Sequence, residues 1–117
     1  MVQDWSELTK LLSADIRNLR IGAPDVMKAF SAMATSAGAA GALDAKTKEL
    51  IALAIGVATR CDDCIAFHAK AASQHGATKE EVMETLAMSI YMGAGPSVMY
   101  ASHALAAFNQ FDAGKAG

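Results

Sequence analysis

The chain has 117 residues and a mass of 12.1 kDa, which leaves room for one domain, so we treat residues 1–117 as a single unit. Hydrophobic residues make up 53% of the sequence and charged residues 19%, and this composition excludes a disordered chain. Ten basic and 12 acidic side chains give a formal net charge of -2. Such a balance offers no electrostatic footprint for nucleic acid or for an anionic membrane surface.

Apolar residues recur at helical spacing, and no strand-like alternation competes with them. The first predicted helix ends at Gly22 and carries Leu8, Leu11, Leu12, Ile16 and Leu19. Pro24 suits the first position of a second helix. Asp44 is placed to cap a third helix, which we expect to run to about Arg60. The interior of that helix, residues 50–57, is apolar on all sides, which predicts a central buried helix.

The second half of the sequence predicts three further helices. Asp62 or Asp63 is expected to cap the fourth helix, and Gly76 to terminate it. The run Thr78-Lys79-Glu80-Glu81 matches a capping box and opens a fifth helix, and Pro96 opens the sixth. The sequence thus predicts an all-α fold, a compact single domain of about six short helices.

One apolar stretch is long enough to raise the question of a membrane span. Residues 85–111 contain no Asp, Glu, Lys or Arg. However, Gly93-Ala94-Gly95-Pro96 interrupts the stretch, which favours two buried helices joined by a turn. The N-terminus lacks the basic start and apolar run of a secretory signal, and two cysteines are too few for a disulfide-stapled secreted scaffold. We therefore predict a cytoplasmic protein that does not enter a membrane.

The predicted core is thin. Alanine dominates the apolar residues, and aromatic residues reach only 6%. Because such a core buries little apolar area, a lone subunit should be marginally stable, and we expect a homo-oligomer. We expect Trp5 and the first helix to pack on another subunit, and the seven methionines to fill gaps in the core.

Both cysteines fall in one short run, Cys61-Asp62-Asp63-Cys64-Ile65-Ala66-Phe67-His68. The second cysteine lies in the first turn of the predicted helix, where free N–H groups and the helix dipole favour the nucleophilic thiolate. A neighbouring thiol can then trap an oxidised sulfur as a disulfide. Asp62 and Asp63 act in the opposite direction, because they place negative charge near the sulfurs.

His68 follows Cys64 by four residues, so the two side chains lie only ~40° apart around the helix. An imidazole one turn from a thiol can accept its proton, or remain as imidazolium beside the thiolate. Two sulfurs and one histidine leave a tetrahedral zinc site incomplete, and we predict no metal site. The alternative interpretation of the cysteines is a pair of buried, inert side chains.

Glu49, followed by Cys61-x-x-Cys64-x-x-x-His68 in a small alanine-rich helical domain, resembles the alkylhydroperoxidase D and carboxymuconolactone decarboxylase superfamily. The resemblance implies an alkylhydroperoxidase D-like fold and a thiol-dependent peroxidase, an oxidoreductase. In that reaction Cys64 attacks the hydroperoxide, Cys61 closes a redox disulfide, and His68 and Glu49 relay the proton. The resemblance also implies no bound cofactor, an external dithiol reductant protein, in some members a lipoyl-bearing one, and assembly as trimers or hexamers.

Two points stay open at this stage. Glu49 precedes Cys61 by 12 positions, which is ~18 Å along one straight helix. To reach the thiols it needs a steep helix crossing, a bend near Gly56, or delivery from a neighbouring subunit. Two other functions also remain, namely a non-enzymatic redox sensor or binding module, and a carboxymuconolactone decarboxylase-like enzyme in which the cysteines are incidental.

Overall fold

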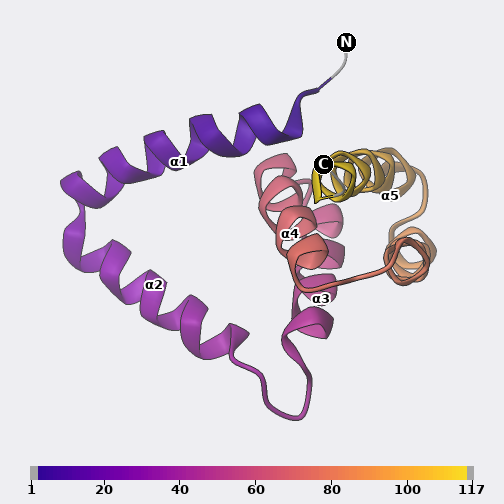
Figure 1. Ribbon diagram of the computed structural model, residues 1–117, viewed down its shortest axis with the longest axis horizontal. Helices are drawn as coiled ribbons and strands as arrows, with labels where there is room; N and C mark the ends of the chain where they lie inside the picture. Colours follow the sequence, from indigo (N-terminus) through magenta and orange to yellow (C-terminus); the bar gives the residue numbers. More distant parts are fainter. Residues whose placement is uncertain (1–2, 116–117) are drawn as a thin grey trace.

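The structure is a computed structural model that describes residues 3–115, and within them it is helical with no strand (Figure 1). The elements in chain order are α1 (Trp5–Gly22), α2 (Pro24–Gly38), α3 (Ala45–Ala58), α4 (Asp62–Gln74) and α5 (Lys79–Lys115). Helices α3, α4 and α5 pack together, while α1 and α2 form an arm that extends away from them (Figure 1). The all-α fold predicted from the sequence is confirmed.

The last two predicted helices are the two halves of α5. Ala94 interrupts that element with a left-handed φ of 54° and a ψ of -141°, and the halves run in different directions (Figure 1). The residues responsible are those of the predicted break: Pro96 cannot continue the backbone ladder of the preceding turn. Within residues 3–115, the two expected helices are thus the two halves of α5, with the interruption where the sequence places it.

Helices α3, α4 and α5 enclose a core that is as rich in alanine as the composition indicates. Phe108, Leu53 and Ile65 are its largest fully buried side chains. Half of the buried apolar residues are alanines, at positions 66, 69, 72, 77, 101, 104 and 107. Side chains this small let the helices approach closely, but each removes little apolar surface from water.

The arm packs on this core mainly through the start of α1, and Lys48 of α3 donates hydrogen bonds to the Ala37 and Ala39 carbonyls at the end of α2. Trp5 is 4% exposed and its backbone N–H donates to Gln110 Oε1 over 2.6 Å, so the expectation that Trp5 packs on another subunit is wrong. Helix α2 has no buried residue. Several large apolar side chains of the arm are left in solvent, namely Leu11, Leu19, Ile21, Val26, Phe30 and Met33.

Three predicted helix ends are confirmed. The Asp44 carboxylate accepts from the Thr47 N–H over 2.8 Å at the start of α3. Thr78 and Glu81 exchange the two hydrogen bonds of a capping box before α5. Gly76, with a φ of 82°, follows the end of α4. These two caps and the left-handed glycine mark where α3 and α5 begin and where α4 ends.

An ion pair fastens the start of α3 to the start of α5. Lys46 Nζ lies 2.8 Å from Glu81 Oε2. The hydrogen bond with Glu81 raises the pKa of Lys46, and the hydrogen bond with Lys46 lowers the pKa of Glu81. Hydrogen bonds from Thr47 lower the pKa of the Asp44 carboxyl. All three groups therefore keep their charges over a wider pH range than in an unfolded chain.

The outer face of α3 differs from the prediction. Ile51 is 44% and Ile55 is 55% exposed, so α3 is not buried on all sides. Together with Met88 and Met92 they line an open cavity of about 660 Å³ between α3 and the first half of α5. The expectation that methionines fill the core is wrong for Met33, Met83, Met88, Met92 and Met99, which are exposed. None of the helices in the described range is both long and apolar enough to cross a bilayer.

Candidate redox site

The turn between α3 and α4 positions both cysteines. The N–H of Arg60 donates to the Val57 carbonyl over 3.2 Å, and the N–H of Cys61 donates to the Gly56 carbonyl over 3.0 Å. This pair of bonds is a Schellman motif, and it requires the left-handed φ of 59° at Arg60. The Arg60 guanidinium also donates to the carbonyl of Ala58 over 2.7 Å. The chain thus reverses within three residues.

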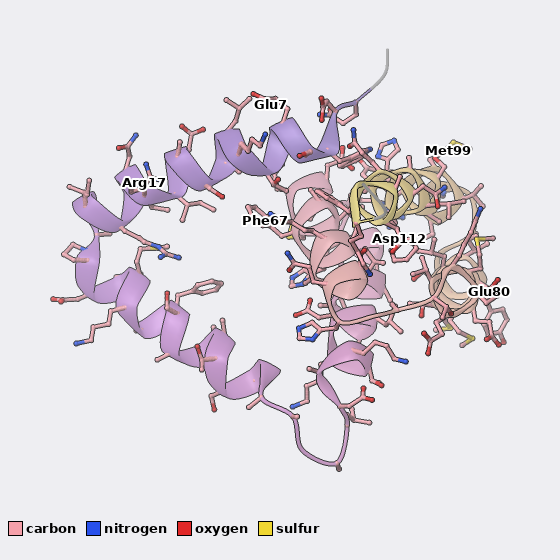
Figure 2. All side chains as sticks on the ribbon, in the orientation of Figure 1. Glu7, Arg17, Phe67, Glu80, Met99 and Asp112 are labelled. Carbon is pink, nitrogen blue, oxygen red and sulfur yellow. A yellow bond between two sulfur atoms is a disulfide. The ribbon has the colours of Figure 1, made fainter. Side chains whose placement is uncertain are left out.

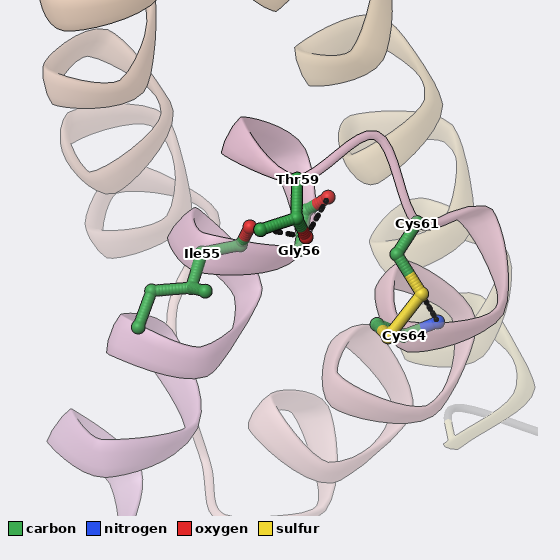
Figure 3. Close-up of a disulfide and its surroundings, with 5 residues drawn as sticks. All are labelled: Ile55, Gly56, Thr59, Cys61 and Cys64. Atoms are coloured by element: carbon green, nitrogen blue, oxygen red, sulfur yellow. Dashed lines mark hydrogen bonds between the residues drawn. A yellow bond between two sulfur atoms is a disulfide. The ribbon is translucent and has the colours of Figure 1, made fainter.

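Cys61 ends this turn and caps the next helix. Its Sγ accepts from the N–H of Cys64 over 3.1 Å, so the predicted caps Asp62 and Asp63 are wrong. They lie in the first turn of α4 instead, because the Schellman motif already places Cys61 at the helix entrance. The two sulfurs are joined as a disulfide, with a Cα–Cα distance of 5.2 Å (Figure 3). Both cysteines are half-buried.

The end of α3 supports the cysteines from behind. A Cβ placed on Gly56 would lie 3.5 Å from Cys64 Cβ, so the two helices touch at this point. Gly56 is fully covered and lies beside the disulfide in Figure 3. This contact fixes the first turn of α4 against α3.

The same packing brings Glu49 to His68. Glu49 Oε2 lies 2.7 Å from His68 Nδ1, with side chains that are 23% and 38% exposed. Because α3 and α4 run antiparallel after the reversal at Arg60, a residue early in α3 faces the middle of α4. Glu49 therefore contacts His68 within its own chain through the reversal between α3 and α4, a route that the three expectations did not include.

A second histidine–carboxylate pair, which the sequence pattern does not predict, lies at the start of α4. His103 Nδ1 lies 2.8 Å from Asp62 Oδ1. The His103 ring is 5.9 Å from that of Trp5 and 5.1 Å from that of Tyr100, measured between centroids. The two residues are 41 positions apart in the sequence, which is why no motif spacing could reveal the pair.

The site has the features of thiol chemistry: two bonded sulfurs at a helix N-terminus and a carboxylate-bound imidazole one turn further along α4. Among the residues that the structure describes, no three His, Cys, Asp or Glu side chains gather closely enough to hold a metal ion. Figure 2 shows Phe67 of α4 pointing into the space between the arm and the core. There Phe67 and residues of α1 line a smaller cavity of about 320 Å³.

The comparisons with known proteins agree with this architecture. Residues 24–107 match the model of the carboxymuconolactone decarboxylase family. An uncharacterized protein from Cupriavidus necator is 48% identical over 90 residues, which cover 77% of this chain and 80% of that protein. The crystal structure of a carboxymuconolactone decarboxylase family protein from Legionella pneumophila superposes with a TM-score of 0.90 at 47% identity, covering 92% of this chain and 96% of the other.

A more distant solved structure extends the comparison. It is a family protein from Thermotoga maritima that has been suggested to take part in the antioxidative response. It superposes with a TM-score of 0.79 at 26% identity, covering 91% of this chain and 92% of that one. With the family match extending over more than half of the sequence, the chain belongs to the carboxymuconolactone decarboxylase family.

Proposed function

We propose that this protein is a thiol-dependent peroxidase that reduces organic hydroperoxides through Cys61 and Cys64. The observation that carries the proposal is the disulfide at the entrance of α4, on the same helix as the His68–Glu49 pair. A helix N-terminus, a base and a resolving thiol favour the reaction of a cysteine with peroxide, and the positions of Cys61, Cys64 and His68 support the proposal. The suggested antioxidative role of the Thermotoga maritima protein is consistent with this activity.

The proposed cycle begins with the reduced pair. The Cys64 thiolate attacks one oxygen of the hydroperoxide, the O–O bond breaks, and the leaving alkoxide takes a proton from His68. Cys64 is now a sulfenic acid. Cys61 attacks its sulfur, water leaves, and the disulfide seen in the structure forms. An external dithiol returns two electrons and two protons, so the sum is hydroperoxide plus dithiol giving alcohol, water and a new disulfide.

His68 and Glu49 have separate roles in this cycle. The Glu49 carboxylate contacts Nδ1 of the ring, which leaves Nε2 free to exchange a proton with the thiol or the leaving alkoxide. The carboxylate also orients the ring and stabilises the imidazolium that forms when Cys64 loses its proton. His68 is therefore the proposed acid–base group, and Glu49 is the group that positions it.

The proposal extends to the partners of the protein. The half-buried disulfide is accessible to a dithiol protein, of which a lipoyl-bearing protein is one kind, and no bound cofactor is required. We also propose that the chain acts as a cytoplasmic homo-oligomer, because the arm and the outer face of α3 leave large apolar side chains in solvent.

The direct test is the intact mass of reduced, chelator-treated protein after one equivalent of cumene hydroperoxide. We expect each chain to lose two hydrogens while one equivalent of peroxide disappears, and Cys64→Ser to show no such loss. Oxidation of the exposed Met88 and Met92 would add oxygen instead, so the two reactions are distinguishable by mass. If both thiols of the wild-type protein stay free over minutes, the peroxidase proposal is wrong.

A second measurement separates an enzyme from a redox sensor. With excess dihydrolipoamide as reductant, a peroxidase consumes many equivalents of hydroperoxide per chain. A sensor is oxidised once and then stops. Retention of any family reaction by Cys64→Ser would point to the third hypothesis, in which the cysteines are incidental.

A further inference from the structure

The entrance of α4 is flanked by two histidine–carboxylate pairs on opposite sides. Asp62 and Cys64 are two positions apart, which is ~200° around the helix, so their side chains leave α4 in opposite directions. On the side of Cys64, His68 contacts Glu49 of α3. On the side of Asp62, His103 of α5 contacts the carboxylate over 2.8 Å. The proposed cycle uses the first pair and leaves the second without a role.

Asp62 is an unfavourable neighbour for a thiolate. It is adjacent to Cys61 in the chain and lies in the first turn of α4, where Asp63 adds a second negative charge. A negatively charged carboxylate close to a cysteine raises the free energy of its thiolate form. The hydrogen bond with His103 offsets part of that repulsion, because it engages the Asp62 carboxylate and draws it toward α5.

The His103 ring is held for this contact from three helices. Trp5 of α1 and Tyr100 of α5 lie at 5.9 Å and 5.1 Å from it, and Asp62 of α4 accepts its hydrogen bond. The Arg60 guanidinium lies over the Tyr100 ring of this group, 5.8 Å from its centre. The His103 and Asp62 side chains are 42% and 44% exposed, so solvent weakens the effect without removing it.

We propose that His103 is a positioning residue for the redox pair, which binds the Asp62 carboxylate, holds it toward α5 and so favours the thiolate. This inference rests on the proposed function, because it assigns a role to His103 in keeping the Cys61–Cys64 pair reactive. In this proposal His103 influences thiolate formation only through Asp62. A double mutant can therefore separate this influence from a general structural role of the His103 ring.

The test measures thiolate formation directly, without hydroperoxide. Reduced protein is alkylated with iodoacetamide over a range of pH, and the modified fraction of each cysteine is followed by mass spectrometry. In His103→Gln we expect alkylation at pH 7 to slow roughly threefold to tenfold. The wild-type rate should be regained near pH 10, where the cysteines of both proteins are thiolates. His75→Gln, which changes an exposed histidine at the other end of α4, is the matched control and should leave the profile unchanged.

A double-mutant cycle identifies the route through Asp62. Asp62→Asn should speed alkylation at pH 7, and adding His103→Gln to it should have no further effect. Equal slowing by His103→Gln in both backgrounds, or an unchanged pH profile, overturns the inference. Should His103→Gln fail to fold by circular dichroism, Asp62→Asn alone decides, because an unchanged or slower rate contradicts the charge argument.

The alkylation test is independent of the peroxidase test. If the cysteines show the expected coupling but hydroperoxide leaves them free, the inference stands and the proposed activity fails. If hydroperoxide forms the disulfide but the double-mutant cycle shows no coupling between His103 and Asp62, the proposed activity stands and the role of His103 fails.

Discussion

Glu49 and His68 form the contact on which proton transfer in the proposed cycle depends. At the scale of single residues, replacing His68 by Gln removes the group that can carry a proton, and replacing Glu49 by Gln removes only its negatively charged partner. We expect His68→Gln to slow the reaction of reduced protein with hydroperoxide by about 100-fold, and Glu49→Gln to slow it less. Stopped-flow measurement of peroxide consumption gives both rates.

The matched control for this pair is Glu84→Gln, which removes an exposed carboxylate from α5. It should react at the wild-type rate. If His68→Gln reacts as fast as the wild type, His68 is not the acid–base group, and the assignment of Glu49 fails with it.

The polar residues of the site differ in how far the sequence could reveal them. Cys61, Cys64 and His68 are spaced by three and four positions, which is about one helical turn each, so their spacing alone places them together. Glu49 was identified by family resemblance, and its path to His68 needed the chain reversal at Arg60. His103 comes from a different helix with no periodic relation to the motif, and only tertiary packing brings it to Asp62.

At the scale of the element, the kink in α5 depends on close contact between two small residues. A Cβ on Gly93 would lie 1.8 Å from Ser97 Oγ, whereas a Cβ on Gly95 meets nothing within 4 Å. Gly93→Ala should therefore destabilise the protein by about 1–3 kcal/mol, and Gly95→Ala should change its stability by less than about 1 kcal/mol. Thermal unfolding followed by circular dichroism compares the two variants.

Ser97 provides the second half of that comparison. Its hydroxyl is fully buried and has no hydrogen-bond partner within residues 3–115. Removing it in Gly93→Ala/Ser97→Ala relieves the shortest contact and should recover part of the lost stability. Equal melting temperatures for Gly93→Ala and Gly95→Ala would show that the kink does not depend on this contact.

The helix ends show why some boundaries can be predicted and others cannot. Asp44 and Thr78 have local sequence signatures, and their hydrogen bonds are made within three residues of the cap. The entrance of α4 has a similar signature in Asp62 and Asp63, but the preceding turn makes Cys61 the capping residue. Two helices joined by a Schellman motif share Cys61, and a pattern analysis of either helix alone cannot show that.

At the scale of the whole molecule, the arm lacks the burial that would hold it in place. A helix of 15 residues is marginal in water by itself, and α2 has no buried residue. We therefore expect the protein to associate with further copies that cover the apolar side of the arm, where Phe30 and Met33 are exposed. Light scattering after size-exclusion chromatography should give a multiple of the 12.1 kDa chain mass.

A pair of variants tests which face of α2 is covered. Phe30→Ser removes an apolar side chain and should shift the protein toward smaller species. Lys28→Ser lies ~200° away around the helix and should not. A stable wild-type monomer at micromolar concentration would show that the thin core and the exposed arm suffice without a partner.

The sequence predicted the number of turns and breaks along the chain better than the distribution of exposed surface. Apolar spacing predicts which residues can share a helix face. The same spacing does not say whether a face meets its own chain or another molecule. Ile51 and Ile55 of α3 illustrate this limit, because they were predicted to be buried and are exposed.

The sulfur cap of α4 links the covalent state of the protein to its secondary structure. The acceptor for the N–H of Cys64 is an atom that gains and loses electrons, so oxidation and helix initiation form one linked equilibrium. A thiolate is a stronger hydrogen-bond acceptor than a neutral sulfur, and it also benefits from the helix dipole. By thermodynamic reciprocity, whatever free energy the thiolate adds to the first turn of α4, the folded helix returns to the thiolate.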